Sequence, residues 1–280
     1  MFPDKYAIIV GKGDLPIRML KTLKDKNIDF LVAGIKGFSP RCLVNGYPHF
    51  WFYIGEVGDL ISKLKSNGVN KIIMVGAISR PSLFALRVDS LGKEIIANYR
   101  KIIRGDNSIL SIVIQVFQSH GLEVVAPQIL DPAILVEEKY YTNVELNEAN
   151  KADIMYGLEV AKEIGKLDIG QSLIVQQNII IAIEAAEGTK KMILRSKSLL
   201  KKNGSKGILI KLKKPGQEDK VDLPVIGDLT IVEARKAGLG GIIVEAQNSI
   251  ILNQEKLKKL ADKYGIFVIG ITPNTKFELS

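Results

Sequence analysis

The stretch YAIIVGKGDLPIRML, residues 6–20, decides the fold of the first half of the chain. Its first five residues are apolar and predict a short buried strand. Gly11 and Gly13 then mark a turn, and from Leu15 onward apolar residues recur at helical spacing, with Pro16 where a first helical turn tolerates proline. A strand that passes through a glycine turn directly into a helix is typical of parallel α/β sheets.

The same alternation of strand and helix continues to residue 126. Further strands are predicted at 30–33, 71–78 and 122–126, and helices at 57–64, 93–104 and 106–120. Strands separated by helices argue for a parallel sheet with helices on both faces. An aperiodic stretch with two prolines follows and is interpreted as a linker. The sequence thus predicts a first domain at 1–130, a linker at 131–140 and a second domain at 141–280.

The second half has a different order of elements and predicts an α/β domain with a mixed sheet. A hairpin is expected at 171–185, turning at Gln177 and Asn178. Helices are expected at 147–165, 228–237 and 254–264, with a lysine-rich helix after the hairpin, and strands at 207–212, 241–245, 249–252 and 266–271.

Composition limits the classes of partner. The net charge of +9 favours anionic partners. Much of the excess lies in a lysine-rich stretch at 190–220, which is interpreted first as a solvated face, with attraction of an anionic substrate or membrane as the alternative. Aromatic residues make up only 6% and do not alternate with the lysines, so no nucleic-acid partner is expected. Cys42 is the single cysteine, which excludes a disulfide within the chain or a thiolate metal cluster.

The distribution of apolar residues favours a cytoplasmic protein. No apolar run approaches the roughly 18 residues that a membrane span needs. The first residues, MFPDKYAIIVG, have neither a long apolar region nor a small-residue cleavage site, so no signal peptide is expected.

The glycine turn is the first candidate site. Gly11 and Gly13 allow a phosphate to approach the backbone, and the helix that begins near Leu15 adds N–H groups and positive potential. A dinucleotide fingerprint would have a third Gly or Ala where Pro16 stands, and an acid after the second strand, where there is none. An NAD-dependent oxidoreductase is therefore disfavoured, while a purely structural turn remains open.

A second candidate is the sequence GAISRP at 76–81, where the third strand ends. In open α/β sheets, ligands bind at the carboxyl ends of strands. Beyond Gly76, Ser79 can donate to a phosphate and Arg80 can hold one through two parallel hydrogen bonds. The alternative is a capped turn with a surface arginine.

Three segments of the second half carry polar groups at turns. Gln171 ends the LDIGQ sequence that enters the hairpin. Glu187, Gly188 and Thr189 leave the hairpin and begin a helix, whose free N–H groups favour an anion.

The third segment, VDLP at 221–224, contains Asp222. A carboxylate before an apolar-proline corner is expected to be fixed and partly buried, and it suits Mg²⁺ or acts as a base for water. Lys213 would add positive charge for a transition state. For each segment, a cap, a turn or a solvated acid is the alternative.

These segments together resemble a known family. The runs IGKLDIGQSLIVQQNIIIAIEAAEGT (164–189), VDLPVIG (221–227), ARKAGLGGIIVEA (234–246) and GIFVIGI (265–271) resemble the LpxI family of UDP-2,3-diacylglucosamine pyrophosphatases. The glycine-Leu-Pro turn and the GAISRP sequence extend the resemblance over nearly the whole chain. Family members usually have three glycines before the Leu-Pro. In this chain, Lys12 and Asp14 replace a glycine and a small residue of that turn.

The resemblance implies hydrolysis of UDP-2,3-diacylglucosamine to UMP and 2,3-diacylglucosamine 1-phosphate in the lipid A synthesis of a Gram-negative cell. It implies a cofactor of the Mg²⁺ or Mn²⁺ type, with Asp222 as the critical carboxylate and metal ligand. The substrate, a lipid-linked sugar nucleotide, would lie between a Rossmann-like N-terminal domain and the C-terminal domain.

The implied location is cytoplasmic and peripheral to the inner membrane, with transient contact to an anionic membrane surface. A homodimer is possible. A non-catalytic sugar-nucleotide-binding protein remains the alternative from another functional class.

Overall fold

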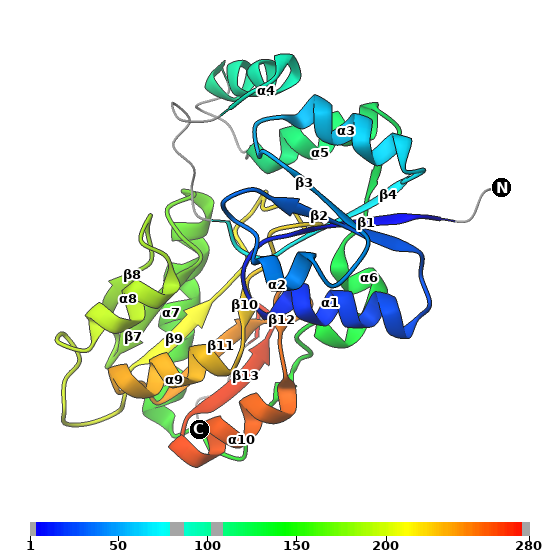
Figure 1. Cartoon of the computed structure of the whole chain (residues 1–280). Coiled ribbons are helices and arrows are strands. Elements are labelled where there is room, and N and C mark those ends of the chain that lie inside the picture. The colour runs from blue at the N-terminus through cyan, green and yellow to red at the C-terminus, as the bar shows by residue number, and fades with distance from the viewer. Residues whose placement is uncertain (1–3, 79–86, 102–108, 276–280) are drawn as a thin grey trace. The chain divides into compact units, whose positions relative to one another are not determined.

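The computed structural model describes residues 4–78, 87–101 and 109–275 (Figure 1). It confirms the predicted α/β class, because a five-stranded parallel sheet lies in the first half of the chain and a separate six-stranded mixed sheet in the second.

The chain divides into two compact units. Unit 1 comprises Met1–Pro132 and Glu218–Asp222, and unit 2 comprises Ala133–Gln217 and Leu223–Ser280. The segment Glu218–Asp222 is therefore part of unit 1, although the chain on both sides of it belongs to unit 2.

The sheet of unit 1 has the order β3-β2-β1-β4-β5, and all neighbouring strands are parallel. Its strands are β1 (Tyr6–Val10), β2 (Phe30–Ile35), β3 (His49–Phe52), β4 (Lys71–Val75) and β5 (Glu123–Val124). The central strand, β1, is buried along its whole length, as its continuous apolar sequence predicts. The strand order reverses between β1 and β4, and such reversals create the crevice in which open α/β sheets bind ligands.

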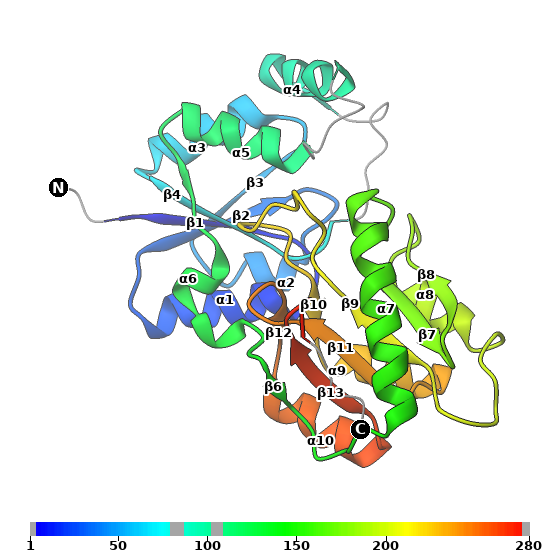
Figure 2. The same cartoon turned by 180° about the vertical axis from the view of Figure 1, so that it is seen from behind.

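Helices cover both faces of this sheet, as expected. They are α1 (Asp14–Asp25), α2 (Arg41–Val44), α3 (Val57–Ser66), α4 (Ser90–Lys101), α5 (Ile109–Ser119) and α6 (Pro127–Leu130). Figures 1 and 2 show α1 and α6 on one face, and α3 and α5 on the other. The apolar stripe of α1 is buried, which explains why the helix forms where the spacing of its leucines predicts it.

The sheet of unit 2 has the order β6-β13-β11-β9-β7-β8. The strands β9, β11 and β13 are parallel, whereas β6, β7 and β8 pair antiparallel with their neighbours. Its strands are β6 (Lys139–Tyr140), β7 (Ser172–Gln176), β8 (Ile179–Ile183), β9 (Ile208–Lys211), β11 (Gly241–Glu245) and β13 (Phe267–Ile271). A separate two-stranded sheet consists of β10 (Val225–Ile226) and β12 (Ile250–Ile251). The predicted linker contains a 3-10 turn, Pro132–Ile134, and the edge strand β6.

Helices also lie on both faces of the second sheet. They are α7 (Glu148–Lys166), α8 (Thr189–Ser196), α9 (Asp228–Ala237) and α10 (Gln254–Tyr264). One apolar cluster joins α7 to one face of the sheet, and another joins α8, α9 and α10 to the opposite face. The carboxyl ends of the parallel strands β9, β11 and β13 lie at one edge of this sheet, where Lys211 is the last residue of β9 and Glu245 the last residue of β11.

The hairpin of β7 and β8 turns where the sequence predicts it, at Gln177 and Asn178. Both residues have positive φ, at 52° and 55°, which is the conformation that a two-residue hairpin turn requires. Asp153 of α7 is fully buried, and its carboxylate accepts hydrogen bonds from the backbone N–H groups of Gln177, at 3.0 Å, and Asn178, at 2.5 Å. A helix side chain thus supports the strained turn.

An Asp153→Ala variant is expected to be less stable by about 1.5–3 kcal/mol, the usual contribution of hydrogen bonds to a charged group. The measurement is chemical denaturation followed by circular dichroism. Asp25→Ala, which removes an exposed carboxylate at the end of α1, is the matched control. Equal midpoints for the two variants would contradict a supporting role of Asp153.

Candidate functional site

The predicted glycine turn packs tightly against the end of β4. The backbone N–H of Gly11 donates to the Val75 carbonyl at 2.7 Å, and Lys12 and Ala77 exchange two backbone hydrogen bonds of 2.9 and 2.8 Å. A Cβ atom on Gly11 would lie 2.7 Å from the Gly76 carbonyl, so the two loops touch through their glycines.

This packing gives several of the predicted site residues a structural role. Gly76 has φ of 94°, and a Cβ there would lie 2.7 Å from the ring of Pro16. Leu15 and Pro16 are buried in unit 1. Gly13, with φ of 112°, precedes α1 without a side-chain cap. The structure thus brings Gly11, Pro16 and Gly76 together. A phosphate at this turn would be held from Gly13 onward, because the backbone N–H groups of Gly11 and Lys12 already donate to Val75 and Ala77.

The other two residues of the second candidate, Ser79 and Arg80, lie outside the described residues, so their proposed contacts with phosphate remain predictions.

A buried polar chain in unit 2 joins the start of α8 to the sheet. The Thr189 hydroxyl donates to Glu184 Oε2 at 3.0 Å, and the Lys211 ammonium donates to Thr189 Oγ1 at 3.0 Å. Glu184 and Lys211 are only 7% and 6% exposed. Ser172 is paired opposite Lys211, and among the described residues nothing hydrogen-bonds its fully buried hydroxyl. Three of these four polar side chains, Ser172, Glu184 and Lys211, are buried, and Thr189 is half-buried between Glu184 and Lys211.

The sequence did not identify Lys211 and Glu184 as site residues. Glu184 interrupts the most apolar stretch of the chain, and Lys211 ends the apolar strand β9. A charged residue within a predicted buried strand was the available signal, because such a group is rarely buried without a partner.

The loop with the LDIGQ sequence packs against Glu184, a member of this buried polar chain. A Cβ on Gly170 would lie 2.0 Å from the Glu184 carbonyl, so only glycine fits there. The Gln171 carbonyl accepts from the Leu212 N–H at 2.9 Å. Asp168, at φ of 55°, accepts from the Lys214 ammonium at 2.5 Å. The LDIGQ and EGT sequences, far apart along the hairpin, thus meet around Glu184.

Glu187 and Gly188 have different surroundings. Glu187 accepts from the Arg195 guanidinium at 2.9 and 2.6 Å, which ties the start of α8 to its last turn. Gly188 has φ of 83° and precedes α8 without a side-chain cap. Gly188 and Thr189 therefore lie at the helix end that favours anions, whereas the Glu187 carboxylate is engaged by arginine.

Lys213 lies where β9 and β11 end. Its backbone N–H donates to Glu245 Oε2 at 2.8 Å, and Asn248 donates to Glu245 Oε1 at 2.7 Å. Glu245 is 6% exposed. The backbone of Lys213 is thereby fixed at the carboxyl edge of the parallel strands.

Asp222 differs from the expectation in its burial. Its side chain is exposed, whereas Leu223 and Pro224 are buried. The preceding Val221 packs against the apolar core of unit 1, and the Gln128 amide donates to the Asp219 carbonyl at 3.1 Å. The expectation of a partly buried Asp222 is therefore wrong, because burial at this corner is confined to the apolar Leu223 and Pro224.

A divalent cation held by the protein alone needs several carboxylate or imidazole ligands in one place. Within 4–78, 87–101 and 109–275, no three His, Cys, Asp or Glu side chains gather as a ready metal site. Mg²⁺ is often held by only one or two carboxylates together with substrate phosphates. An exposed single carboxylate such as Asp222 fits that second kind of site, in which the substrate supplies further oxygens.

Comparisons with known proteins cover nearly the whole chain. The model of the LpxI N-terminal domain matches residues 5–134, and that of the LpxI C-terminal domain matches 137–269. The chain is 32% identical over 278 residues to the UDP-2,3-diacylglucosamine pyrophosphatase LpxI of Caulobacter vibrioides, covering 97% of this chain and 99% of the relative.

Among solved structures, the CobK precorrin-6A reductase has a TM-score of 0.32 at 10% identity, covering 99% of this chain and 92% of that one. An N-terminal ketoreductase from a macrolactin assembly line has a TM-score of 0.25 at 13% identity, covering 97% of this chain and 55% of that one. Both scores are too low to support a functional comparison. The two family models and the full-length relative show that the chain belongs to the LpxI family.

Proposed function

We propose that the protein hydrolyses the pyrophosphate bond of UDP-2,3-diacylglucosamine, giving UMP and 2,3-diacylglucosamine 1-phosphate in lipid A biosynthesis. The observation that carries the proposal is the match over 97% of the chain to a relative with that activity in its name. The LDIGQ and EGT sequences that supported the resemblance also meet around one buried polar chain, which is consistent with a shared role.

The charges of unit 2 suit an anionic substrate. A pyrophosphate resists attack by water because its oxygens are negative, so catalysis requires positive charge aimed at them. The Lys211 ammonium, hydrogen-bonded at the uncapped start of α8, supplies such charge together with the helix N–H groups. In this proposal, Gly188, Thr189 and Lys213 bind phosphate oxygens, and Gln171 keeps the neighbouring loop in place.

The proposed metal site consists of Asp222 and the pyrophosphate of the substrate. A bound Mg²⁺ or Mn²⁺ would neutralise the phosphate oxygens and lower the pKa of a water. Asp222 would hold the metal ion or orient the water, because its carboxylate is exposed. That the substrate lies between the two domains remains a prediction.

The decisive assay combines the purified protein with the acylated UDP-sugar and detects UMP. Hydrolysis is expected in Mg²⁺ or Mn²⁺, loss of hydrolysis in excess chelator, and recovery when the ion is restored. Full activity in excess chelator would contradict the metal site. Binding of the UDP-lipid without turnover under every ionic condition would instead favour the sugar-nucleotide-binding alternative.

We also propose reversible association with anionic bilayers. No helix in the described ranges is long and apolar enough to cross a membrane. Lys201, Lys202 and Lys206 are exposed, and the nearby Leu194 and Leu199 are 41% and 55% exposed. Each lysine near an acidic surface contributes on the order of 1 kcal/mol, so binding is expected to weaken as salt rises.

Flotation with acidic liposomes measures this association. A variant with Lys201, Lys202 and Lys206 changed to glutamine is expected to float poorly. Matched changes of the exposed lysines 21, 24 and 26, in and just after α1, should leave flotation unchanged. Equal loss in both variants would show that net charge alone, rather than this surface, governs binding.

A further inference from the structure

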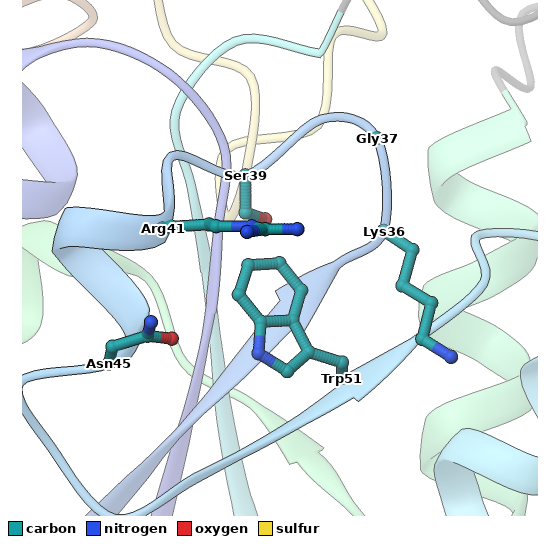
Figure 3. Close-up of a pocket in the computed structure, with 6 residues that line it drawn as sticks. All are labelled: Lys36, Gly37, Ser39, Arg41, Asn45 and Trp51. Carbon is teal, nitrogen blue, oxygen red and sulfur yellow. The ribbon is translucent and has the colours of Figure 1, made fainter.

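A cavity of about 830 Å³ opens in unit 1 where β2 and β3 end. None of the side chains that line it is acidic. They are Lys36, Gly37, Ser39, Arg41, Asn45 and Trp51 (Figure 3).

The Trp51 indole forms one wall of this cavity. A Cβ on Gly34 of β2 would lie 2.8 Å from the indole and 3.0 Å from Val44, so the ring rests directly on the β2 backbone. Trp51 is half-buried. Figure 3 shows the ring below the Arg41 guanidinium, with Asn45 on one side and Lys36 on the other. A flat aromatic surface supported from behind is suited to stacking a planar group.

The loop above the indole is held by backbone contacts. The Ser39 hydroxyl donates to the Val10 carbonyl at 2.5 Å and accepts from the Ile35 N–H at 2.7 Å. The Lys36 N–H donates to the Phe52 carbonyl at 2.8 Å. The loop is thus tied to β1, β2 and β3, and the cavity wall exists before a ligand arrives.

Two cationic residues, Lys36 and Arg41, line the cavity together with Trp51. The Lys36 ammonium lies 4.4 Å from the centroid of the Tyr53 ring. Across the residues that the structure describes, no carboxylate forms an ion pair with Lys36 or Arg41. A planar surface beside two positive charges matches a ligand that has both an aromatic ring and a phosphate, because arginine binds phosphate oxygens in pairs.

We propose that this cavity binds the nucleotide half of the substrate, with the base stacked on Trp51 and the phosphate beside Lys36 and Arg41. The inference rests on the proposed function for the identity of the base, uracil. A dinucleotide fits less well, because the Lys12–Ala77 backbone bridge occupies the crevice between β1 and β4 that its second half would cross.

Trp51 is the only tryptophan of the chain, so its fluorescence reports on the cavity directly. Titration of the full chain with UMP is expected to quench this fluorescence in a saturable way. Uridine should quench with weaker affinity, since it lacks the phosphate, and ribose 5-phosphate should leave the emission nearly unchanged, since it lacks the base.

Variants separate the two halves of the proposed contact. By calorimetry, Trp51→Leu should weaken UMP binding by about tenfold or more, whereas Trp51→Phe should retain most of the affinity. Lys36→Ala and Arg41→Ala should weaken UMP but not uridine. Lys65→Ala, at an exposed lysine of α3, is the charge-matched control and should bind UMP normally.

Three results would overturn the proposal: no quenching by millimolar UMP, unchanged UMP affinity in a folded Trp51→Leu variant, or tighter binding of NADP(H) than of UMP. Hydrolysis of the UDP-lipid with a normal KM in Trp51→Leu would remove the cavity from the substrate site and leave the proposed function standing. If UMP binds to the cavity as expected but the UDP-lipid is not hydrolysed, the result supports the cavity and counts against the proposed function.

Discussion

Asp222→Ala is expected to fold, to bind the intact UDP-lipid and to lose kcat by about 10² or more, the scale for removing one key electrostatic group. The side chain is exposed, so its loss should cost little stability. If the carboxylate holds the metal or activates water, it acts chiefly in the transition state. Interactions made only in the transition state change kcat more than substrate affinity.

Substrate affinity should come from groups that Asp222 does not touch. These are the uracil, the sugar and the acyl chains. Removing a negative charge near a pyrophosphate is even expected to tighten binding of the UDP-lipid slightly, because like charges repel.

Two further variants sharpen the test of Asp222. Asp222→Asn keeps the shape and removes the charge, and it should be nearly as inactive as alanine. Asp219→Ala removes another exposed carboxylate from the same segment, Glu218–Asp222, and should retain activity. Melting temperature, UDP-lipid affinity and kcat are measured on one preparation. A near-normal kcat in folded Asp222→Ala would exclude the residue from the mechanism.

The elements that the sequence predicted well are those in which local pattern and tertiary packing agree. The helices Asp228–Ala237 and Gln254–Tyr264 have clear apolar spacing and end before glycines with positive φ. The strand β3 was missed because it is four residues long and follows a Gly-Tyr-Pro turn. The edge strand β6 was assigned to the linker, since its two exposed residues show no period and pair only with β13.

Site residues, too, were predicted where the local sequence pattern indicates them and missed where only tertiary packing does. Thr189 was predicted from the start of its helix, and the structure places its hydroxyl against Glu184. Gly170, which also packs against Glu184, was not predicted, although it precedes the predicted Gln171 in the LDIGQ sequence. Lys211 was missed because a lysine at a strand end normally reaches solvent. Only the pairing of β7 with β9, which places Lys211 opposite Ser172, shows that it is buried. For Asp222, the apolar-proline corner predicted burial, but only Leu223 and Pro224 are buried and Asp222 itself is exposed.

The second large effect is expected at Lys211. Lys211→Met should lower the free energy of unfolding by about 3–5 kcal/mol, the range for removing one charge from a buried charged network. Methionine has a similar length, so little cavity forms. The loss arises because the Glu184 carboxylate is only 7% exposed. In the variant it keeps the hydrogen bond from the Thr189 hydroxyl, but the Lys211 ammonium that donates to Thr189 no longer balances its charge.

A double-mutant cycle with Glu184→Gln separates stability from catalysis at this polar chain. The neutral glutamine still accepts from Thr189 and needs no counter-charge, so adding it to Lys211→Met should recover much of the lost stability. Lys206→Met, at an exposed lysine before β9, is the control and should melt like the native protein.

If Lys211 supplies charge to the pyrophosphate, the stabilised double variant remains inactive, because the ammonium is still missing. Native-like stability of Lys211→Met alone would contradict the buried network. Full activity of the double variant would assign Lys211 to folding and leave the anion contacts to the start of α8.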